Sequence, residues 1–255
     1  MRQLRDIFED TVLAFLTAAT HEEAFEKLDS LCTQLGQIDV NDISQTVWAY
    51  QPDLLAKVAS VDAKEEKRAA KEMLKAKQDG TDNYSWALPD YYEQEYAFIL
   101  ANVPPSSLDS ISYVGHGAIS ALGSMLNENP LVERINFYDT DIEMTQLGWK
   151  MAERFYAIQS ELSYSTEDFL ARKSEEPEDG LTVVTNAPLS AFRDEKALLT
   201  SKYVFLRATT DKGALLYPSI DLNEDLHPDY EVIASHDDEL YGIHSFHILR
   251  RRPEC

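Results

Sequence analysis

Cysteine, long apolar runs and basic residues are all scarce in this sequence, and each scarcity excludes a class of protein. Only Cys32 and Cys255 occur, so neither a disulfide framework nor a cysteine zinc site can be built. No stretch reaches the roughly 18 apolar residues of a membrane span. Acidic residues interrupt the first apolar segment, so we do not expect a signal peptide. The sequence therefore predicts a protein of the reducing cytoplasm with no membrane partner.

The charge balance excludes a second class of partner. The chain has 45 acidic and 23 basic residues, which gives a formal net charge of −22. Nucleic-acid binding needs a basic surface, so no nucleic-acid partner is expected. The run Arg250–Arg252 is too short to reverse this and is interpreted as a solvated tail. The 255 residues, 44% of them hydrophobic, suffice for one large domain or two small ones.

The chain divides at Pro104-Pro105, which is the clearest linker in the sequence. Apolar residues before the linker recur at helical spacing, with a helix start near Thr20 and a helix end at Gly36. We therefore predict a helical N-terminal domain over residues 1–105. The helices are expected within 2–35 and over 42–49, 52–61, 62–78 and 91–103.

The glycine-rich stretch after the linker is the strongest local motif. A short buried strand, 110–114, runs into Gly115-His116-Gly117, and a second strand, 131–138, ends at Asp139. Glycines let the backbone approach a ligand, and a following helix N-terminus offers free N–H groups. Ser120 stands where a dinucleotide fingerprint has its third glycine. The motif therefore favours S-adenosylmethionine (SAM), which has no pyrophosphate; a tight turn without a ligand is the alternative.

Asp139 is the candidate for the ribose hydroxyls, because it follows directly on the second strand, with Thr140 beside it. The alternative is a helix cap for the helix starting near Ile142, a role that Asp141 could equally fill. His116 either touches the ligand or is merely tolerated between the glycines.

Strands and helices alternate from Leu108 onward, which predicts a parallel sheet covered by helices. Two extended runs at the end of the chain predict an antiparallel hairpin on the edge of that sheet. This order is typical of the Rossmann-like class I SAM-dependent methyltransferase fold, so we predict an α/β chain in which residues 106–255 form a SAM-binding domain after the all-α N-terminal domain. The strands are expected at 110–114, 131–138, 160–164, 181–185, 202–207, 230–235 and 243–249, and the helices at 118–127, 142–158 and 190–200.

Further candidates follow the later strands, where open α/β sheets bind ligands. Asp168 could accept from the adenine amino group or could cap a helix. Asn186-Ala187-Pro188 could line the reacting centre, with the first two residues near SAM and the proline near the acceptor, or could be a simple turn. Arg207 could bind an amino-acid carboxylate through two parallel hydrogen bonds or could pair with one of the many acids of this chain.

Glu95 is the candidate base. It shares one helical face with Tyr91, in a segment dense in aromatic residues. Aromatic neighbours would desolvate the carboxylate and raise its pKa, and tyrosine faces can hold a cationic sulfonium or ammonium. A surface glutamate and an aromatic seam between domains are the alternatives. No metal is expected, because His244 and His247 would point to opposite faces of a strand.

The collinear set of these motifs resembles the nicotianamine synthase family. It looks closest to short bacterial members that act in opine-type metallophore synthesis, of the staphylopine and pseudopaline type. The matching pieces cover most of residues 90–220, whereas the helical N-terminal half agrees in character only. They are DYYEQEYAFI, SYVGHGAISAL, FYDTDIEMTQLGWKMAERF, VTNAPLSAF and YVFLRATTDKGALLYPS.

The resemblance implies an enzyme that transfers the 3-amino-3-carboxypropyl (aminobutyrate) group of SAM, its co-substrate, to an amine and releases methylthioadenosine. Histidine is the implied acceptor, and no metal is required. Glu95 matches the family's catalytic glutamate and Tyr113 falls close to an active-site tyrosine. Tyr91, Pro188, Arg207 and Tyr217 would bind the acceptor, Tyr217 within the element Leu215–Pro218. His116 departs from the small residue usual between the glycines.

Two other functions stay open at this point. An ordinary SAM-dependent small-molecule methyltransferase would use the same glycine turn and the same Asp139. A non-catalytic SAM-binding protein would show no turnover at all. The sequence also leaves the acceptor's chirality, the number of transfers and the formation of a homodimer undecided.

Overall fold

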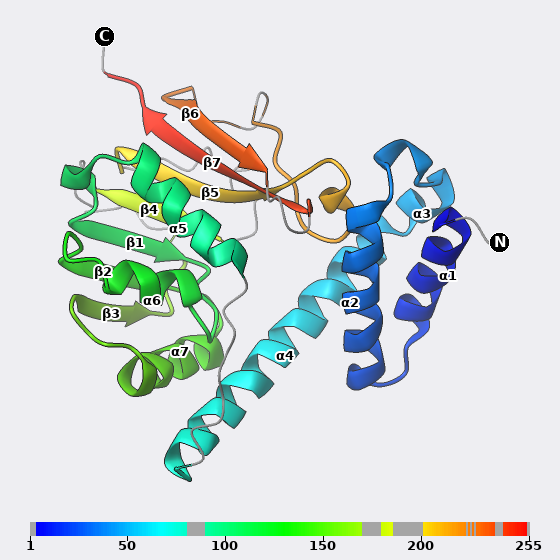
Figure 1. The fold of residues 1–255 in the computed structure, drawn as a ribbon, viewed down its shortest axis with the longest axis horizontal. Helices are drawn as coiled ribbons and strands as arrows, with labels where there is room; N and C mark the ends of the chain where they lie inside the picture. The colour runs from blue at the N-terminus through cyan, green and yellow to red at the C-terminus, as the bar shows by residue number, and fades with distance from the viewer. Residues whose placement is uncertain are drawn as a thin grey trace. The chain divides into compact units, whose positions relative to one another are not determined.

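The computed structural model describes residues 4–80, 90–169, 180–185, 201–222, 224, 226, 228–237 and 242–253 (Figure 1). Its contacts group the chain into two compact units. The N-terminal unit comprises Met1–Glu65, Ala208–Ile220 and Asp237–Ser245, and the sheet unit comprises Glu66–Arg207, Asp221–His236 and Phe246–Cys255. The boundary along the chain thus falls at Glu65–Glu66, and the division into domains at residue 105 stays a prediction.

The N-terminal unit is mainly helical. Thr20 caps α2 as predicted, since its side chain accepts from the Glu23 N–H. Gly36 does not end that helix, which continues to Gln37 and closes at Ile38. The two helices predicted at 52–61 and 62–78 are one, because neither glycine nor proline interrupts the chain between them. The helices that begin in this unit are α1 (Leu4–Thr17), α2 (His21–Gln37), η1 (Val40–Asp42), α3 (Gln45–Ala49), α4 (Gln51–Gln78) and η4 (Gly213–Leu215). The part of α4 from Glu66 onward belongs to the sheet unit.

Apolar stripes on these helices form the core of the N-terminal unit. The residues of each stripe recur three or four positions apart, so each helix buries one face. A fully buried side chain of this size contributes about 1.5–3 kcal/mol. Residues from the C-terminal part of the chain belong to the same core. Its members include Phe8, Val12 and Phe15 of α1, Leu28, Leu31 and Leu35 of α2, Leu54, Val58 and Val61 of α4, and Leu215, Leu216 and Ile243.

The sheet unit is built on a seven-stranded sheet of order β3-β2-β1-β4-β5-β7-β6. β1 pairs in parallel with β2 and β4, and the pairs β2–β3 and β4–β5 are parallel as well. β7 runs antiparallel to β5. The Arg251 N–H at the end of β7 donates to the carbonyl of Lys202, just before β5, and the N–H of Thr210, just after β5, donates to the carbonyl of Ile243, just before β7. The strands are β1 (Ser110–Val114), β2 (Arg134–Tyr138), β3 (Glu161–Ser165), β4 (Leu181–Val184), β5 (Tyr203–Thr209), β6 (Tyr230–Asp237) and β7 (His244–Arg251).

This topology confirms the predicted Rossmann-like methyltransferase fold with a helical N-terminal region. The strand order reverses between β1 and β4, so the carboxyl ends of these strands form the switch point at which open α/β sheets bind ligands. α6 begins at Ala121 rather than residue 118, since the turn after β1 extends to Ser120. The helix predicted at 190–200 lies outside the described residues. The other helices of this unit are α5 (Asp90–Asn102), η2 (Pro105–Ser107), α6 (Ala121–Asn127) and α7 (Ile142–Phe155).

Helices and sheet share one core in this unit. α6 packs on β2, α7 on β3 and α5 on α6. Ile111, Phe137 and Phe205 are completely buried in the strands. Within the described ranges, none of the helices combines the length and apolar character needed to cross a membrane.

A polar cluster interrupts the core of the N-terminal unit. Burial raises the pKa of Asp62 to about 6, although a hydrogen bond from Tyr217 opposes this shift. Burial also raises the pKa of Cys32 to about 12 and that of Tyr217 well above its usual value. Asp62 is therefore the member of this cluster that changes charge near neutral pH.

We predict that Asp62→Asn stabilises the protein at neutral pH. Folding raises the pKa of this carboxyl from 3.8 to about 6, so the folded state loses stability as pH rises through this window. Asparagine keeps a hydrogen-bonding group without the buried charge. The free energy of unfolding in urea should therefore increase by about 2 kcal/mol near pH 7.5 and stay unchanged near pH 3.5.

The matched control for this measurement is Asp29→Asn, which alters an exposed carboxylate on α2. It should show no such pH-dependent gain. An equal gain from Asp62→Asn at both pH values would contradict the role of a buried charge.

Candidate functional site

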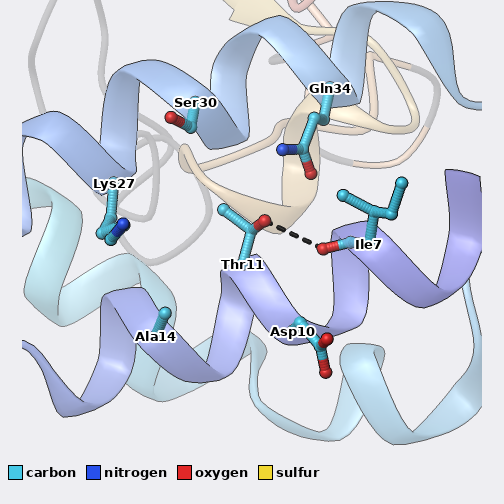
Figure 2. A pocket seen from close by; sticks show the side chains of 7 residues that line it. All are labelled: Ile7, Asp10, Thr11, Ala14, Lys27, Ser30 and Gln34. Atoms are coloured by element: carbon cyan, nitrogen blue, oxygen red, sulfur yellow. Dashed lines mark hydrogen bonds between the residues drawn. The ribbon is translucent and has the colours of Figure 1, made fainter.

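A shallow pocket of about 250 Å³ lies between α1 and α2 of the N-terminal unit (Figure 2). Thr11 Oγ1 donates to the Ile7 carbonyl within it at 2.8 Å. None of the predicted site residues lines this pocket, so it adds nothing to the functional assignment. Its lining consists of Ile7, Asp10, Thr11, Ala14, Lys27, Ser30 and Gln34.

The predicted glycine turn lies at the carboxyl end of β1 and adopts the conformation that glycine favours. Gly115 has φ 71° and Gly117 has φ 65°, both in the left-handed region. The Gly117 N–H donates to the Asp139 carboxylate at 3.0 Å, and the Asp141 N–H donates to the same carboxylate at 2.9 Å. The structure thus brings together the turn and the acid that the sequence paired.

Asp141, not Asp139, is the cap of α7. Its side chain accepts from the N–H groups of Glu143 and Met144, so Asp139 at the strand end is left to face the glycine turn. Thr140 between them is exposed. This arrangement removes the main alternative for Asp139, because one of the two acids is enough to cap the helix.

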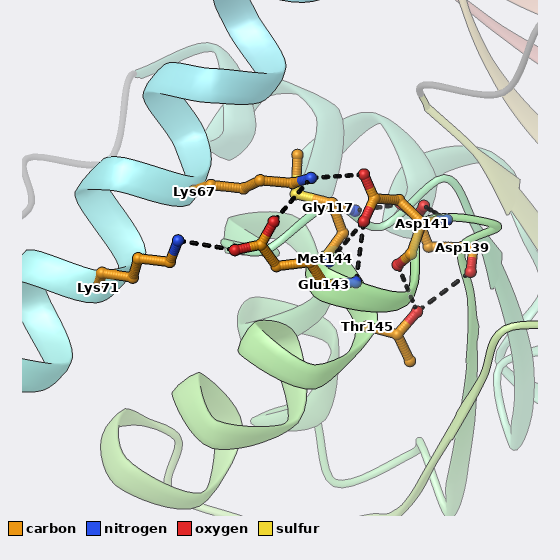
Figure 3. A network of polar contacts seen from close by, with 8 residues as sticks. All are labelled: Lys67, Lys71, Gly117, Asp139, Asp141, Glu143, Met144 and Thr145. Carbon is orange, nitrogen blue, oxygen red and sulfur yellow. Dashed lines mark hydrogen bonds and ion pairs between the residues drawn. The ribbon is translucent and has the colours of Figure 1, made fainter.

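Two lysines of α4 bind the N-terminal end of α7 (Figure 3). Lys67 Nζ lies 2.6 Å from Asp141 Oδ2 and 3.2 Å from Glu143 Oε2, and Lys71 Nζ lies 2.7 Å from Glu143 Oε1. The hydrogen bond from Lys67 lowers the pKa of Asp141, and that from Lys71 lowers the pKa of Glu143. The second half of α4 is therefore fixed beside the turn between β2 and α7.

His116 points into the interior of the sheet unit. Its ring is 3% exposed and meets the rings of Phe137 and Tyr164 edge-on. Burial lowers the pKa of His116 to about 4, although the negative charge of Asp139 acts to raise it. A Cβ on Gly148 of α7 would lie 2.8 Å from the imidazole, so that glycine makes room for the ring. The contact of the His116 side chain with a ligand stays a prediction.

Glu95 and Arg207 form a buried ion pair. Arg207 Nε donates to Glu95 Oε1 at 2.5 Å and Arg207 Nη2 to Glu95 Oε2 at 2.7 Å, and the Glu95 and Arg207 side chains are 0% and 7% exposed. The Arg207 guanidinium carbon also lies 5.4 Å from the centre of the Tyr92 ring. Glu95 is thus no surface glutamate, and Arg207 adopts the internal ion pair that was its alternative.

This pair changes the physical argument for Glu95. From the sequence we expect aromatic rings around the Glu95 carboxylate, and these rings would favour its neutral form. The structure adds a guanidinium in bidentate geometry, which favours the charged form. The difference arises because Arg207 is 112 positions away in the chain.

Tyr113 is influenced by the charges of this ion pair and is hydrogen-bonded toward the glycine turn through Thr185. Burial raises the pKa of Tyr113 above its usual value, whereas the nearby charge of Arg207 and a hydrogen bond with Thr185 lower it. Thr185 Oγ1 in turn donates to the Gly115 carbonyl at 3.0 Å. Tyr113 therefore lies within the electrostatic influence of Glu95 and Arg207 and is hydrogen-bonded to Thr185, which in turn bonds to the glycine turn.

Sequence reasoning missed three residues of this region. Thr185 ends the predicted strand before Asn186 and could have been suspected from that place. Glu66 and Lys67 carry no such signal, because they lie on a charged helix that looks like many others. Glu66 Oε1 accepts from the Ile119 N–H at 2.9 Å, within the stretch that follows the glycine turn.

The remaining candidate site residues lie away from the glycine turn or outside the described residues. Asp168 is exposed after β3. Tyr217 belongs to the N-terminal unit, where it contacts Asp62 and Cys32. The structure describes no side chain for Tyr91 and nothing of Asn186, Ala187 and Pro188. Across the part of the chain that the structure does describe, no group of three or more His, Cys, Asp or Glu residues could hold a metal ion.

We predict that Arg207→Met destabilises the protein by about 3–5 kcal/mol, because it leaves a buried carboxylate without its countercharge. The double variant Glu95→Gln/Arg207→Met should recover part of this loss, since it removes both charges. Urea unfolding of the single and double variants measures the coupling.

Arg250→Met is the matched control, because it breaks an exposed ion pair with Glu231. It should change the free energy of unfolding very little. If Arg207→Met cost no more than this control, the buried pair would have no structural role.

Comparison with known proteins gives structural relatives only. No protein-family model matches the sequence, and no curated protein matches it. The structure is similar to a glutamate-to-glutamine mutant of MtNAS, a nicotianamine synthase, in complex with S-adenosylmethionine. The TM-score is 0.71 at 14% sequence identity, over 99% of this chain and 100% of that one.

A second MtNAS structure, in complex with MTA and tNA, also gives a TM-score of 0.71, at 13% identity over the same shares of both chains. At such low identity the likeness establishes the fold. That fold extends over the helical N-terminal region as well as over the seven-stranded sheet.

Proposed function

We propose that this protein transfers the 3-amino-3-carboxypropyl group of SAM to the amine of an amino acid and releases methylthioadenosine. Histidine is the proposed acceptor, and the proposed setting is the synthesis of a nicotianamine-like metallophore in the cytoplasm. The observation that carries the proposal is the full-length likeness to MtNAS, a protein crystallised with SAM and with MTA. The motif resemblance over residues 90–220 supports the same assignment.

The glycine turn is the proposed SAM site. Gly115 and Gly117 allow the backbone to approach the ligand, and Asp139 at the end of β2 would accept hydrogen bonds from the ribose hydroxyls. Asp168 after β3 is the proposed partner of the adenine. SAM brings its own leaving group on sulfur, so the proposed reaction needs no metal.

The proposed chemical step is a substitution at the Cγ carbon of the aminobutyrate group. The lone pair of a neutral amine forms the N–C bond while the C–S bond breaks. The electron pair of that bond stays on sulfur, which becomes the neutral thioether of methylthioadenosine. The proton lost by the nitrogen passes to the Glu95 carboxylate. Tyr113 and Arg207, next to Glu95, would orient the acceptor and the carboxylate.

Glu95→Gln should leave SAM binding intact and reduce transfer to histidine by at least about 100-fold, the usual contribution of a general base. Mass spectrometry of the products also decides the reaction, because aminobutyrate transfer releases methylthioadenosine and methyl transfer releases S-adenosylhomocysteine. Glu93→Gln, at an exposed position on the same helix, is the control and should retain full turnover.

Unchanged turnover in Glu95→Gln would remove Glu95 from the mechanism. S-adenosylhomocysteine as the product would establish the methyltransferase alternative. Wild-type protein that binds SAM but converts neither histidine enantiomer nor any other amine would favour a binding protein.

Asp139→Ala should weaken SAM binding by about 10-fold to 100-fold, because two ribose hydroxyls lose a charged acceptor. Isothermal titration calorimetry with SAM measures this change. Glu128→Ala, which alters an exposed acid after α6, should bind SAM as the wild type does. Equal affinity of the Asp139 and Glu128 variants would overturn the ribose assignment.

A further inference from the structure

The carboxylate of Glu66 lies against the glycine turn, although Glu66 belongs to α4, far from this turn in the sequence. Its Oε1 accepts from the Ile119 N–H at 2.9 Å. Glu66 and the turn belong to the same compact unit. The contact therefore belongs to the internal structure of the sheet unit.

Gly117 is adapted to this carboxylate. A Cβ at this position would lie 2.8 Å from both Cδ and Oε2 of Glu66, and closer still to Oε1. A residue with a Cβ at this position would therefore displace the Glu66 carboxylate. It would also be strained, because φ is 65° here. The second glycine of the motif thus gives space to a carboxylate of the protein itself.

Two carboxylates consequently meet the same short stretch of backbone. Asp139 accepts from the Gly117 N–H and Glu66 accepts from the Ile119 N–H, two residues further on. Each takes a different N–H group, so they do not compete for one donor. Two carboxylates beside one short stretch of backbone favour a ligand that carries both hydroxyl groups and a positive charge.

The position of Glu66 is fixed by its neighbour in the sequence. Lys67 bonds to Asp141 at 2.6 Å and to Glu143 at 3.2 Å, as Figure 3 shows. These contacts anchor this turn of α4 beside the start of α7. A carboxylate placed in advance costs little conformational entropy when a ligand binds, which makes it suitable for recognition.

We infer that Glu66 binds the α-ammonium group of the aminobutyrate arm of SAM. This inference rests on the proposed function, in which SAM is the substrate. Asp139 would hold the ribose at one end of SAM and Glu66 the ammonium at the other. Fixing the ammonium restricts rotation of the arm, and so determines which side of its Cγ carbon faces the acceptor amine. Glu66 is in this sense a specificity-determining residue for the transferred group.

Glu66→Gln tests the inference, with binding measured by calorimetry on the full-length protein. Glutamine can still accept from the Ile119 N–H but lacks the charge that an ammonium prefers. Three ligands separate the contributions. SAM has both the ammonium and the sulfonium, S-adenosylhomocysteine keeps the ammonium without the sulfonium, and methylthioadenosine has neither.

The dissociation constants of SAM and S-adenosylhomocysteine should each rise about 10-fold in Glu66→Gln, whereas that of methylthioadenosine should change less than about 2-fold. Unchanged methylthioadenosine binding also shows that the site is folded. Glu72→Gln, on the same helix, where the Glu72 side chain is 43% exposed and pairs with Arg68, should alter none of the three constants.

Three results would overturn the inference. Equal changes for all three ligands would mean that Glu66 only shapes the turn. A loss for SAM alone would mean that it senses the sulfonium. Tighter binding of all three would mean that it obstructs the site. Failure of the proposed function looks different: the wild type would bind none of the ligands, which ends both proposals, or would release S-adenosylhomocysteine while the binding pattern of Glu66→Gln still holds.

Discussion

The buried pair of Glu95 and Arg207 is the interaction on which the candidate site depends. Two charged groups with 0% and 7% exposure have lost most of their hydration, and each can remain there only because the other is present. Their bidentate geometry joins α5 to β5, elements that lie on either side of the glycine motif in the sequence. Both charges act on the pKa of Tyr113, which is hydrogen-bonded to Thr185, and Thr185 Oγ1 donates to the Gly115 carbonyl. Loss of one partner would therefore leave a buried charge without its countercharge and would also change the electrostatic environment of Tyr113.

Much of the fold could be predicted because local patterns determine it. Strand β1 was placed at its observed bounds, since a short apolar run before a glycine turn has few other conformations. The alternation of strands and helices was enough to predict a parallel sheet. Errors occurred where the signal is weak or ambiguous. The turn after β1 is longer than expected, so α6 starts late. Apolar spacing alone predicts two helices, at 52–61 and 62–78, whereas the charged segment 62–78 continues the first of them as one helix.

The candidate site was predictable to the extent that it follows the sheet topology. Gly117 and Asp139 meet because parallel neighbours β1 and β2 end at the same edge. The partner of Glu95 could not be deduced in the same way. This chain has 45 acids for 23 basic residues, so any arginine has many possible partners. Glu66 was unpredictable for the same reason: a carboxylate on an amphipathic charged helix shows its role only when the helix is placed.

The pair with Arg207 also constrains how Glu95 would act in the proposed transfer. A guanidinium in bidentate contact keeps the carboxylate charged. A charged carboxylate stabilises the positive charge that develops on the amine as the N–C bond forms, and this charge is absent from the neutral amine before attack. In the proposed transfer this interaction would therefore be stronger in the transition state than in the ground state, which is the condition for catalysis. In the proposed transfer, the proton would pass to Glu95 only after bond formation, since the nitrogen becomes acidic enough to release its proton only after it has been alkylated.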